Sequence, residues 1–291
     1  MNKLFILIAY PYFSEKVYNA LKERDPDEYE LIIDSGAFSV FKSGKTIELD
    51  DYHKFLDSVS DLPILKAIQL DVMGDEKKSW DNFLKSRSLG YNVAPVFTRG
   101  TNINEIEKMY EYSDLVFIGA TRGVGGPGYV KYVLENNKNR NCHILGTLNT
   151  EFLKHYKPYS CDVSSWISAA RYGTLNVYKG GGELYQIMKK DFIRRPAPDV
   201  LKKLSKLGFT DREITFLGKK QCWVYSGYHS GEINESNLKS TTQFFNTVSW
   251  VYRQREIYNK LGTKAFMAFC DERQLGLIFN ARDFLRKRGV I

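Results

Sequence analysis

Short apolar runs alternate with amphipathic segments along the first 165 residues. The apolar runs predict strands over residues 4–9, 31–33, 64–70, 93–97, 115–118, 143–145 and 159–163. Helical spacing between them predicts helices over residues 14–24, 50–58, 77–88, 103–112, 128–136 and 150–155, and Asn102 is the expected N-cap of the helix that begins at residue 103. Such alternation in short units is typical of parallel strands joined by helical crossovers.

The number of these units bears on the fold class. At least six precede residue 170, which favours a closed barrel over a short open sheet, with a doubly wound sheet as the alternative. Later in the chain, helices are expected over residues 194–217, 241–261 and 281–288. We therefore expect an α/β protein, an irregular (β/α)8 TIM-type barrel with a small, mainly helical C-terminal extension. The barrel core is expected over residues 1–185, and residues 186–291 are expected to complete it.

The charge of the chain points to a polyanionic partner. The net charge is +8 and the pI is about 9.1, and lysine and arginine gain free energy by replacing counterions along phosphates. Three basic stretches are candidate phosphate contacts, with a solvated helix face as the alternative for each: Lys202–Lys206, Lys219–Lys220 and Arg282–Arg288. We expect the part of the chain from residue 186 onward to contact nucleic acid.

Cysteine usage and hydropathy indicate a cytoplasmic protein. None of the four cysteines forms a CxxC pair, and the spacing of Cys222, His229 and Cys270 matches no standard metal site. The apolar start, MNKLFILIAYPYF, lacks a small-residue cleavage site and predicts a buried strand. No run reaches the roughly 18 apolar residues of a membrane span, so we expect neither a metal nor a membrane contact.

Three acidic residues follow apolar runs, at the carboxyl ends of predicted strands. They are Asp34 in IIDSGAFS, Asp71 in IQLDVMGD and Asp162 in SCDVSSW. In a barrel the strand carboxyl ends converge on one mouth, so these side chains are expected to meet there. The alternative for each is a helix or turn cap. Three together favour a functional site.

Glycines occur at the same places. Gly36, Gly119 and Gly146 lie just past predicted strands, where the backbone turns sharply or approaches a ligand. The segment GATRGVGGPG, over residues 119–128, offers backbone N–H groups to a phosphate or a flat base. It matches neither the Walker pattern nor the dinucleotide-binding pattern.

Taken in order, these segments resemble the tRNA-guanine transglycosylase superfamily, whose members are irregular (β/α)8 barrels that exchange guanine for a 7-deazaguanine. IIDSGAFS resembles the family's DSGGFQ segment, and LDVMGD resembles the segment that bears its base-recognising aspartate. FIGATRGVGG resembles its glycine-rich segment, and HILGTLNTEFLKHYKPYSCDVSSW resembles the segment that leads to its nucleophilic aspartate. The resemblance covers roughly residues 30–175.

The resemblance implies a role for each site residue. Asp162 corresponds to the nucleophile that forms a covalent glycosyl-enzyme intermediate, Asp34 to the general acid and base, and Asp71 to the residue that reads the base. No cofactor is implied. The further substrate-binding candidates, of which the aromatic ones have core packing as the alternative, are Ser35, Gly36, Phe38, Phe97, Gly119, Gly146 and Trp166.

Departures from the family pattern indicate whether DNA or tRNA is the expected substrate. The CxCxxC…His zinc motif of the bacterial tRNA enzymes is missing, and VAPVFTRG stands where the family carries a base-reading glutamine. The chain is therefore most similar to the compact, phage-type branch that inserts 7-deazaguanines such as preQ0 into DNA, in the host cytoplasm if phage-encoded. The alternatives are a tRNA enzyme, a non-catalytic nucleic-acid-binding barrel, and a barrel hydrolase or lyase of a small sugar or phosphate.

Overall fold

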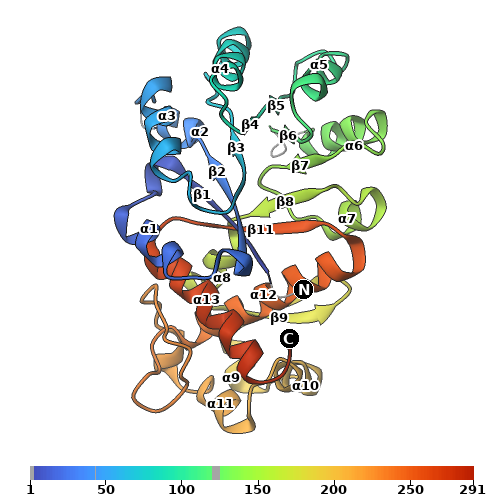
Figure 1. Ribbon diagram of the computed structural model, residues 1–291. Coiled ribbons are helices and arrows are strands. Elements are labelled where there is room, and N and C mark those ends of the chain that lie inside the picture. The colour runs from blue at the N-terminus through green and yellow to red at the C-terminus, as the bar shows by residue number, and fades with distance from the viewer. Residues whose placement is uncertain (1–2, 43, 120–124) are drawn as a thin grey trace. The chain divides into compact units, whose positions relative to one another are not determined.

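The computed structural model describes residues 3–42, 44–119 and 125–291 (Figure 1). Its chain divides into two compact units. The barrel unit comprises Lys3–Val163 and Leu261–Cys270, and the second unit contains Ser164–Lys260 and Asp271–Ile291. Residues 261–270 therefore belong to the barrel unit, although residues 164–260, which precede them in the chain, belong to the second unit.

Parallel strands form the sheet of the barrel unit. Among the described residues it has nine strands in the order β4-β3-β2-β1-β11-β8-β7-β6-β5. Every neighbouring pair is parallel. The strands are β1 (Leu4–Ala9), β2 (Tyr29–Asp34), β3 (Ile64–Ile68), β4 (Val93–Ala94), β5 (Val96–Phe97), β6 (Val116–Ile118), β7 (Cys142–Ile144), β8 (Ser160–Val163) and β11 (Lys264–Phe269).

Pro95 explains why the two ends of this order meet. It separates β4 from β5, so the terminal strands of the sheet are consecutive pieces of one segment. Proline has no N–H to donate to a ladder, but its carbonyl accepts the N–H of Phe117 at 2.9 Å. Counted as one interrupted strand, β4 and β5 make an eight-stranded closed sheet. The expected irregular (β/α)8 barrel is confirmed.

Helices follow most strands of the barrel unit, and Figure 1 shows α3 to α7 outside the strands. They are α1 (Glu15–Lys22), α2 (Ala37–Lys42), α3 (Leu49–Ser58), α4 (Glu76–Ser88), α5 (Glu105–Tyr112), α6 (Gly126–Asn136) and α7 (Thr150–Tyr156). Ser14 and Asp75 cap α1 and α4 by accepting the N–H groups of Val17 and Lys78.

The expected cap of α5 is wrong. Asn104, not Asn102, occupies the N-cap position, and the helix begins two residues later than predicted. The side chain of Asn102 instead accepts the N–H of Asn104 at 3.0 Å, in a turn that precedes the helix. Asparagine stabilises both arrangements by the same kind of bond, because its side-chain oxygen reaches an N–H two residues ahead.

Helices dominate the second unit. They are α8 (Ser168–Arg171), α9 (Lys189–Arg194), α10 (Pro198–Lys206), α11 (Asp211–Phe216), α12 (Thr241–Leu261) and α13 (Glu272–Lys287). The predicted helix over residues 241–261 is confirmed, and α13 begins nine residues before the predicted start at residue 281. An antiparallel hairpin of β9 (Thr174–Gly180) and β10 (Glu183–Met188) was not expected.

Two sequence predictions concern the basic stretch Arg282–Arg288 and membrane-spanning helices. Arg282, expected to contact phosphate, is buried and pairs with Asp283 at 2.9 Å, so the expectation is wrong for this residue. Within the described residues, no helix combines the length and the apolar character needed to cross a membrane.

Candidate active site

The three candidate carboxylates lie at the carboxyl ends of parallel strands of the barrel unit. Asp34 is the last residue of β2, Asp162 is the third residue of β8, and Asp71 follows the end of β3 at Ile68. The ladder continues beyond the strands here, because the Gln69 N–H donates to the Ala94 carbonyl at 3.0 Å. All three aspartates therefore belong to the same edge of the barrel, which is where barrel enzymes carry their sites.

Asp162 is held by two donors on a single oxygen. Its Oδ1 accepts the Gly146 N–H at 2.6 Å and faces His143 Nε2 at 3.1 Å. Gly146 has φ +68°, a conformation in which glycine is unstrained, and this turn directs its N–H to the carboxylate. The side chain of Asp162 keeps 10% of its surface accessible. Within the described structure, Oδ2 is the oxygen left for a ligand.

His143 connects Asp162 to a buried serine. Its ring is fully buried, and its Nδ1 lies 2.8 Å from Ser160 Oγ. When Nε2–H donates to the carboxylate, Nδ1 can accept the Ser160 hydroxyl, so both ring nitrogens have a hydrogen-bond partner. Phe117 and Phe266 pack against the ring at 4.6 and 5.9 Å between centroids, which restricts its rotation.

Strand register brings these residues together. His143 on β7 is the register partner of Ser160 on β8, and alternate residues of a strand face the same side, so Asp162 lies on the same face as Ser160. The hydrogen-bonded chain from Asp162 through His143 to Ser160 was not expected from the sequence. Polar residues at positions 160 and 162 alternate with apolar residues in β8. This pattern identifies the contact with His143 only when the register of β7 and β8 is known.

Asp34 lies in a tight turn that requires glycine. Its carboxylate accepts the Gly36 N–H at 2.7 Å. Gly36 has φ +75°, and a Cβ there would lie 2.4 Å from Cδ of Pro11. Burial raises the pKa of Asp34 to about 6, against the Gly36 hydrogen bond that lowers it, and the negative charge of Asp162 adds to the rise. Such a group exchanges protons near neutral pH.

The pKa of Asp71 is raised more than that of Asp34. Burial raises it to about 7, against the side-chain hydrogen bond from Gln69, and the charge of Asp34 adds to the rise. Gln69 Nε2 donates to Asp71 Oδ1 at 2.5 Å. Burial also raises the pKa of Tyr52, with further contributions from Asp34 and Asp71. Asp34 thus interacts electrostatically with both other carboxylates.

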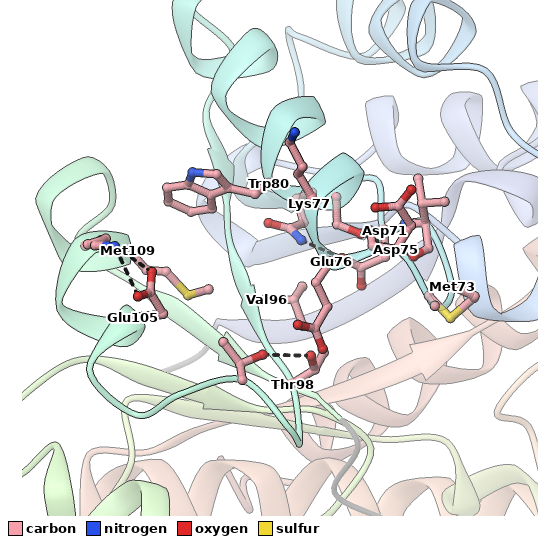
Figure 2. A pocket seen from close by; sticks show the side chains of 16 residues that line it. Asp71, Met73, Asp75, Glu76, Lys77, Trp80, Val96, Thr98, Glu105 and Met109 are labelled. Atoms are coloured by element: carbon pink, nitrogen blue, oxygen red, sulfur yellow. Dashed lines mark hydrogen bonds and ion pairs between the residues drawn. The ribbon is translucent and has the colours of Figure 1, made fainter.

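A cavity of about 620 Å³ opens beside Asp71 (Figure 2). Its lining includes Gln69 and Asp71 after β3, Trp80 of α4, and Val96 and Thr98 at the end of β5. A second cavity of about 280 Å³, next to α2, is also lined by Asp71. Neither lining includes Asp34 or Asp162. Asp71 is therefore the candidate carboxylate that borders both hollows.

The remaining site predictions fall in different environments. Ser35 is buried beside Asp34, whereas Phe38 on α2 is 60% exposed. Phe97 is buried and stacks on Tyr129 with an interplanar angle of 11°, and its carbonyl accepts the N–H of Gly119 at 2.9 Å.

The last two site predictions concern Trp166 and the glycine-rich loop. Trp166 is fully buried and belongs to the second unit. Residues 120–124 of the predicted glycine-rich loop lie outside the described residues. For Gly119 itself, a Cβ would lie 3.0 Å from Val96 Cγ1, so the backbone comes close to β5 at this point.

Metal ligands do not cluster in the described part of the chain, where no group of three histidine, cysteine or acidic side chains is arranged to hold an ion. Comparisons of the chain with protein-family models, curated proteins and solved structures each found no match.

Proposed function

We propose that the protein is a pentosyltransferase that replaces guanine in DNA with a 7-deazaguanine base such as preQ0, through a covalent intermediate on Asp162. The observation that carries this proposal is the anchoring of one Asp162 oxygen by Gly146 and His143, which leaves Oδ2 for a ligand. The electrostatic interaction between Asp34 and Asp162 supports it, because glycosyl transfer commonly uses two carboxyl groups with different protonation states.

In the first half-reaction, Asp162 Oδ2 attacks C1′ of the deoxyribose. The C1′–N9 bond breaks as the C1′–O bond forms, through a transition state with oxocarbenium character that the carboxylate stabilises. The guanine N9 takes up a proton from the carboxylic acid of Asp34, whose pKa of about 6 provides a protonated fraction near neutral pH. Neutral guanine then leaves, and both carboxyl groups have changed state.

In the second half-reaction, the incoming base reverses these steps. Asp34, now a carboxylate, removes the N9 proton of the 7-deazaguanine, and N9 attacks C1′. The C1′–O bond to Asp162 breaks, which restores the starting protonation of both groups. No cofactor and no net proton are consumed.

Asp71 is assigned to base recognition in this proposal. A carboxylate accepts two hydrogen bonds from the N1–H and 2-amino edge of a guanine-like base. Because burial raises the pKa of Asp71 to about 7, these two donors would stabilise the ionised form and release a proton on binding. The target base must leave its stack to reach such a site, which is easiest in single-stranded or distorted DNA.

Mass spectrometry of nucleosides tests this function. Single-stranded DNA, duplex DNA and tRNA are incubated separately with the protein and candidate 7-deazaguanines, then digested to nucleosides. The proposal predicts a 7-deazaguanine deoxynucleoside and an equal amount of released guanine, both absent with Asp162→Asn. Modified nucleoside from tRNA alone would assign the tRNA reaction instead. Binding of nucleic acid without base exchange by the wild type would favour the non-catalytic reading.

A further inference from the structure

The base of the β9–β10 hairpin in the second unit carries an exposed apolar hollow with a basic rim. Its volume is about 480 Å³, and its lining residues are Tyr172, Gly173, Met188, Lys189, Lys190, Ile193 and Arg194. Tyr172 is 76% exposed, and Met188 and Ile193 are also exposed. Exposed apolar side chains gathered at one hollow indicate a surface that binds something.

Local structure explains why these exposed apolar side chains lie together. Met188 at the end of β10 pairs with Thr174 at the start of β9, and the Lys189 N–H donates to the Gly173 carbonyl at 2.8 Å. These bonds place the segment entering the hairpin beside the segment leaving it. On α9, Phe192 is buried while Lys190, Ile193 and Arg194 are exposed. The exposed residues occupy positions i, i+3 and i+4, which share one helix face.

The rim has an uncompensated positive charge. Among the described ion pairs, none involves Lys189, Lys190 or Arg194, and no carboxylate lines the hollow. Asp191 lies on α9 but outside the lining. By contrast, Lys219 pairs with Glu235 and Arg288 with Glu213. The cations around the hollow are therefore available to an anionic ligand.

We propose that this hollow binds single-stranded nucleic acid, with a base on the Tyr172 ring and backbone phosphates on Lys189, Lys190 and Arg194. A tyrosine ring is a stacking platform for an unpaired base, and neighbouring cations follow the phosphates. A duplex keeps its bases stacked inside, so it matches an apolar hollow poorly. The choice of DNA as the polymer rests on the proposed function, whereas the preference for a single strand rests on this surface.

Binding measured without turnover tests the stacking residue. Fluorescence anisotropy of a labelled single-stranded DNA is recorded with the full chain carrying Asp162→Asn, so that base exchange does not interfere. Loss of one stacked base weakens binding by about 5- to 150-fold, and we expect this from Tyr172→Ala but not from Tyr172→Phe. The matched control is Tyr132→Ala, since Tyr132 is an exposed tyrosine of the barrel unit. Equal effects at positions 172 and 132 would overturn the proposal.

Salt dependence tests the cations. Lys190→Gln with Arg194→Gln removes two phosphate contacts, so the slope of log K against log salt becomes shallower by about 1.4 for a single strand. Lys16→Gln with Lys138→Gln removes the same charge from exposed positions of the barrel unit and should leave the slope nearly unchanged. The same slope in both double variants would contradict a defined surface.

The outcomes also separate this inference from the proposed function. Weakening by Tyr172→Ala in a protein that exchanges no base would retain the surface and reject the function. Base exchange by the wild type, with DNA binding unchanged in Tyr172→Ala, would support the proposed function and reject the binding surface. Binding of duplex DNA or anionic phospholipid vesicles with the same loss at Tyr172 would contradict the assignment to a single strand.

Discussion

At the scale of single residues, the chemistry depends on how Asp162 is held. Gly146 and His143 both reach Oδ1, so the carboxylate has one anchored oxygen and one for the substrate. The imidazole is itself fixed by Ser160 and by two aromatic rings. Preorganisation of this kind acts on the transition state, because the nucleophile needs no reorientation when C1′ arrives.

Removal of the imidazole should slow the chemical step. His143→Phe deletes a hydrogen bond to a charged group, a change of about 1.5–3 kcal/mol, which corresponds to a roughly 10- to 150-fold lower kcat. KM for DNA should change little, because His143 is buried and acts through Asp162. Steady-state base-exchange kinetics measure both constants.

Two further variants complete this test. His143→Gln should recover part of the rate because an amide can donate to Asp162, and Ser160→Ala should have the smaller effect. An increase in KM alone, or no recovery with glutamine, would show that His143 does not position the nucleophile.

The raised pKa of Asp71 makes a prediction about stability. The folded-state pKa is about 7 against an ordinary value of 3.8, so the folded state binds the proton more tightly than the unfolded state does. Asp71 should therefore lower the free energy of unfolding as the pH rises from about 4 to about 7, with no further loss above. Asp34 contributes in the same direction with a smaller shift.

Asp71→Asn removes this pH dependence. Thermal melts from pH 4 to pH 8 should show the variant above the wild type at pH 8, by at least the 2–4 °C that about 1 kcal/mol produces in domains of 150–250 residues. The two proteins should converge near pH 4. Asp81→Asn controls for loss of an exposed carboxylate. A variant less stable than the wild type at pH 8 would show that other groups in the folded protein stabilise the ionised Asp71 carboxylate.

At the scale of elements, the local signals predicted most of the barrel unit. β1 has the expected bounds, and α1 begins one residue after its expected start at Ser14, which caps the helix. The failures have local causes. α2 follows the Asp34–Gly36 turn directly, without a polar segment to separate it. The start of α13 was missed although Asp271 accepts the Gln274 N–H at 2.9 Å, a cap that the sequence DERQ contains.

Two strands of the second unit show why sequence spacing alone is insufficient. In β9, residues 174–177 alternate polar and apolar in the sequence TLNV, but Leu175 to Tyr178 are all buried, so Asn176 lies in the interior although alternation predicts an exposed face. The three glycines at 180–182 provide the turn to β10. The turn signal and the alternation were both present in the sequence, but neither indicates that Asn176 is buried beside Asn246, whose Oδ1 accepts the Asn176 N–H at 2.6 Å.

Gly36 links the turn after β2 to the start of α2. Gly36→Ala adds a Cβ that meets Pro11 Cδ at 2.4 Å, whereas Gly44→Ala adds one with no atom within 4 Å. Both glycines have positive φ, so both substitutions carry the same backbone strain of about 1–2 kcal/mol. Chemical denaturation should show a larger loss for Gly36→Ala, together with loss of base exchange. Equal losses would show that Pro11 moves without cost.

At the scale of the whole molecule, barrel closure depends on long-range pairing. β11 pairs with β1 on one side and β8 on the other, although 100 residues separate it from the end of β8. The sequence provided no strand prediction there. Alternation over the first 165 residues predicted the class of fold, but not which segment closes it. The same limit applies to the site, since the meeting of His143 and Asp162 follows from the order and register of β7 and β8.

The covalent intermediate is the most direct test of the account. The protein is mixed with single-stranded DNA without an added base, quenched by denaturation, and digested for peptide mass spectrometry. We predict a deoxyribosyl adduct on the peptide that contains Asp162, which disappears when free guanine is added before the quench and never forms with Asp162→Asn. Base exchange without an adduct, or an adduct on Asp34 or Asp71, would contradict the account.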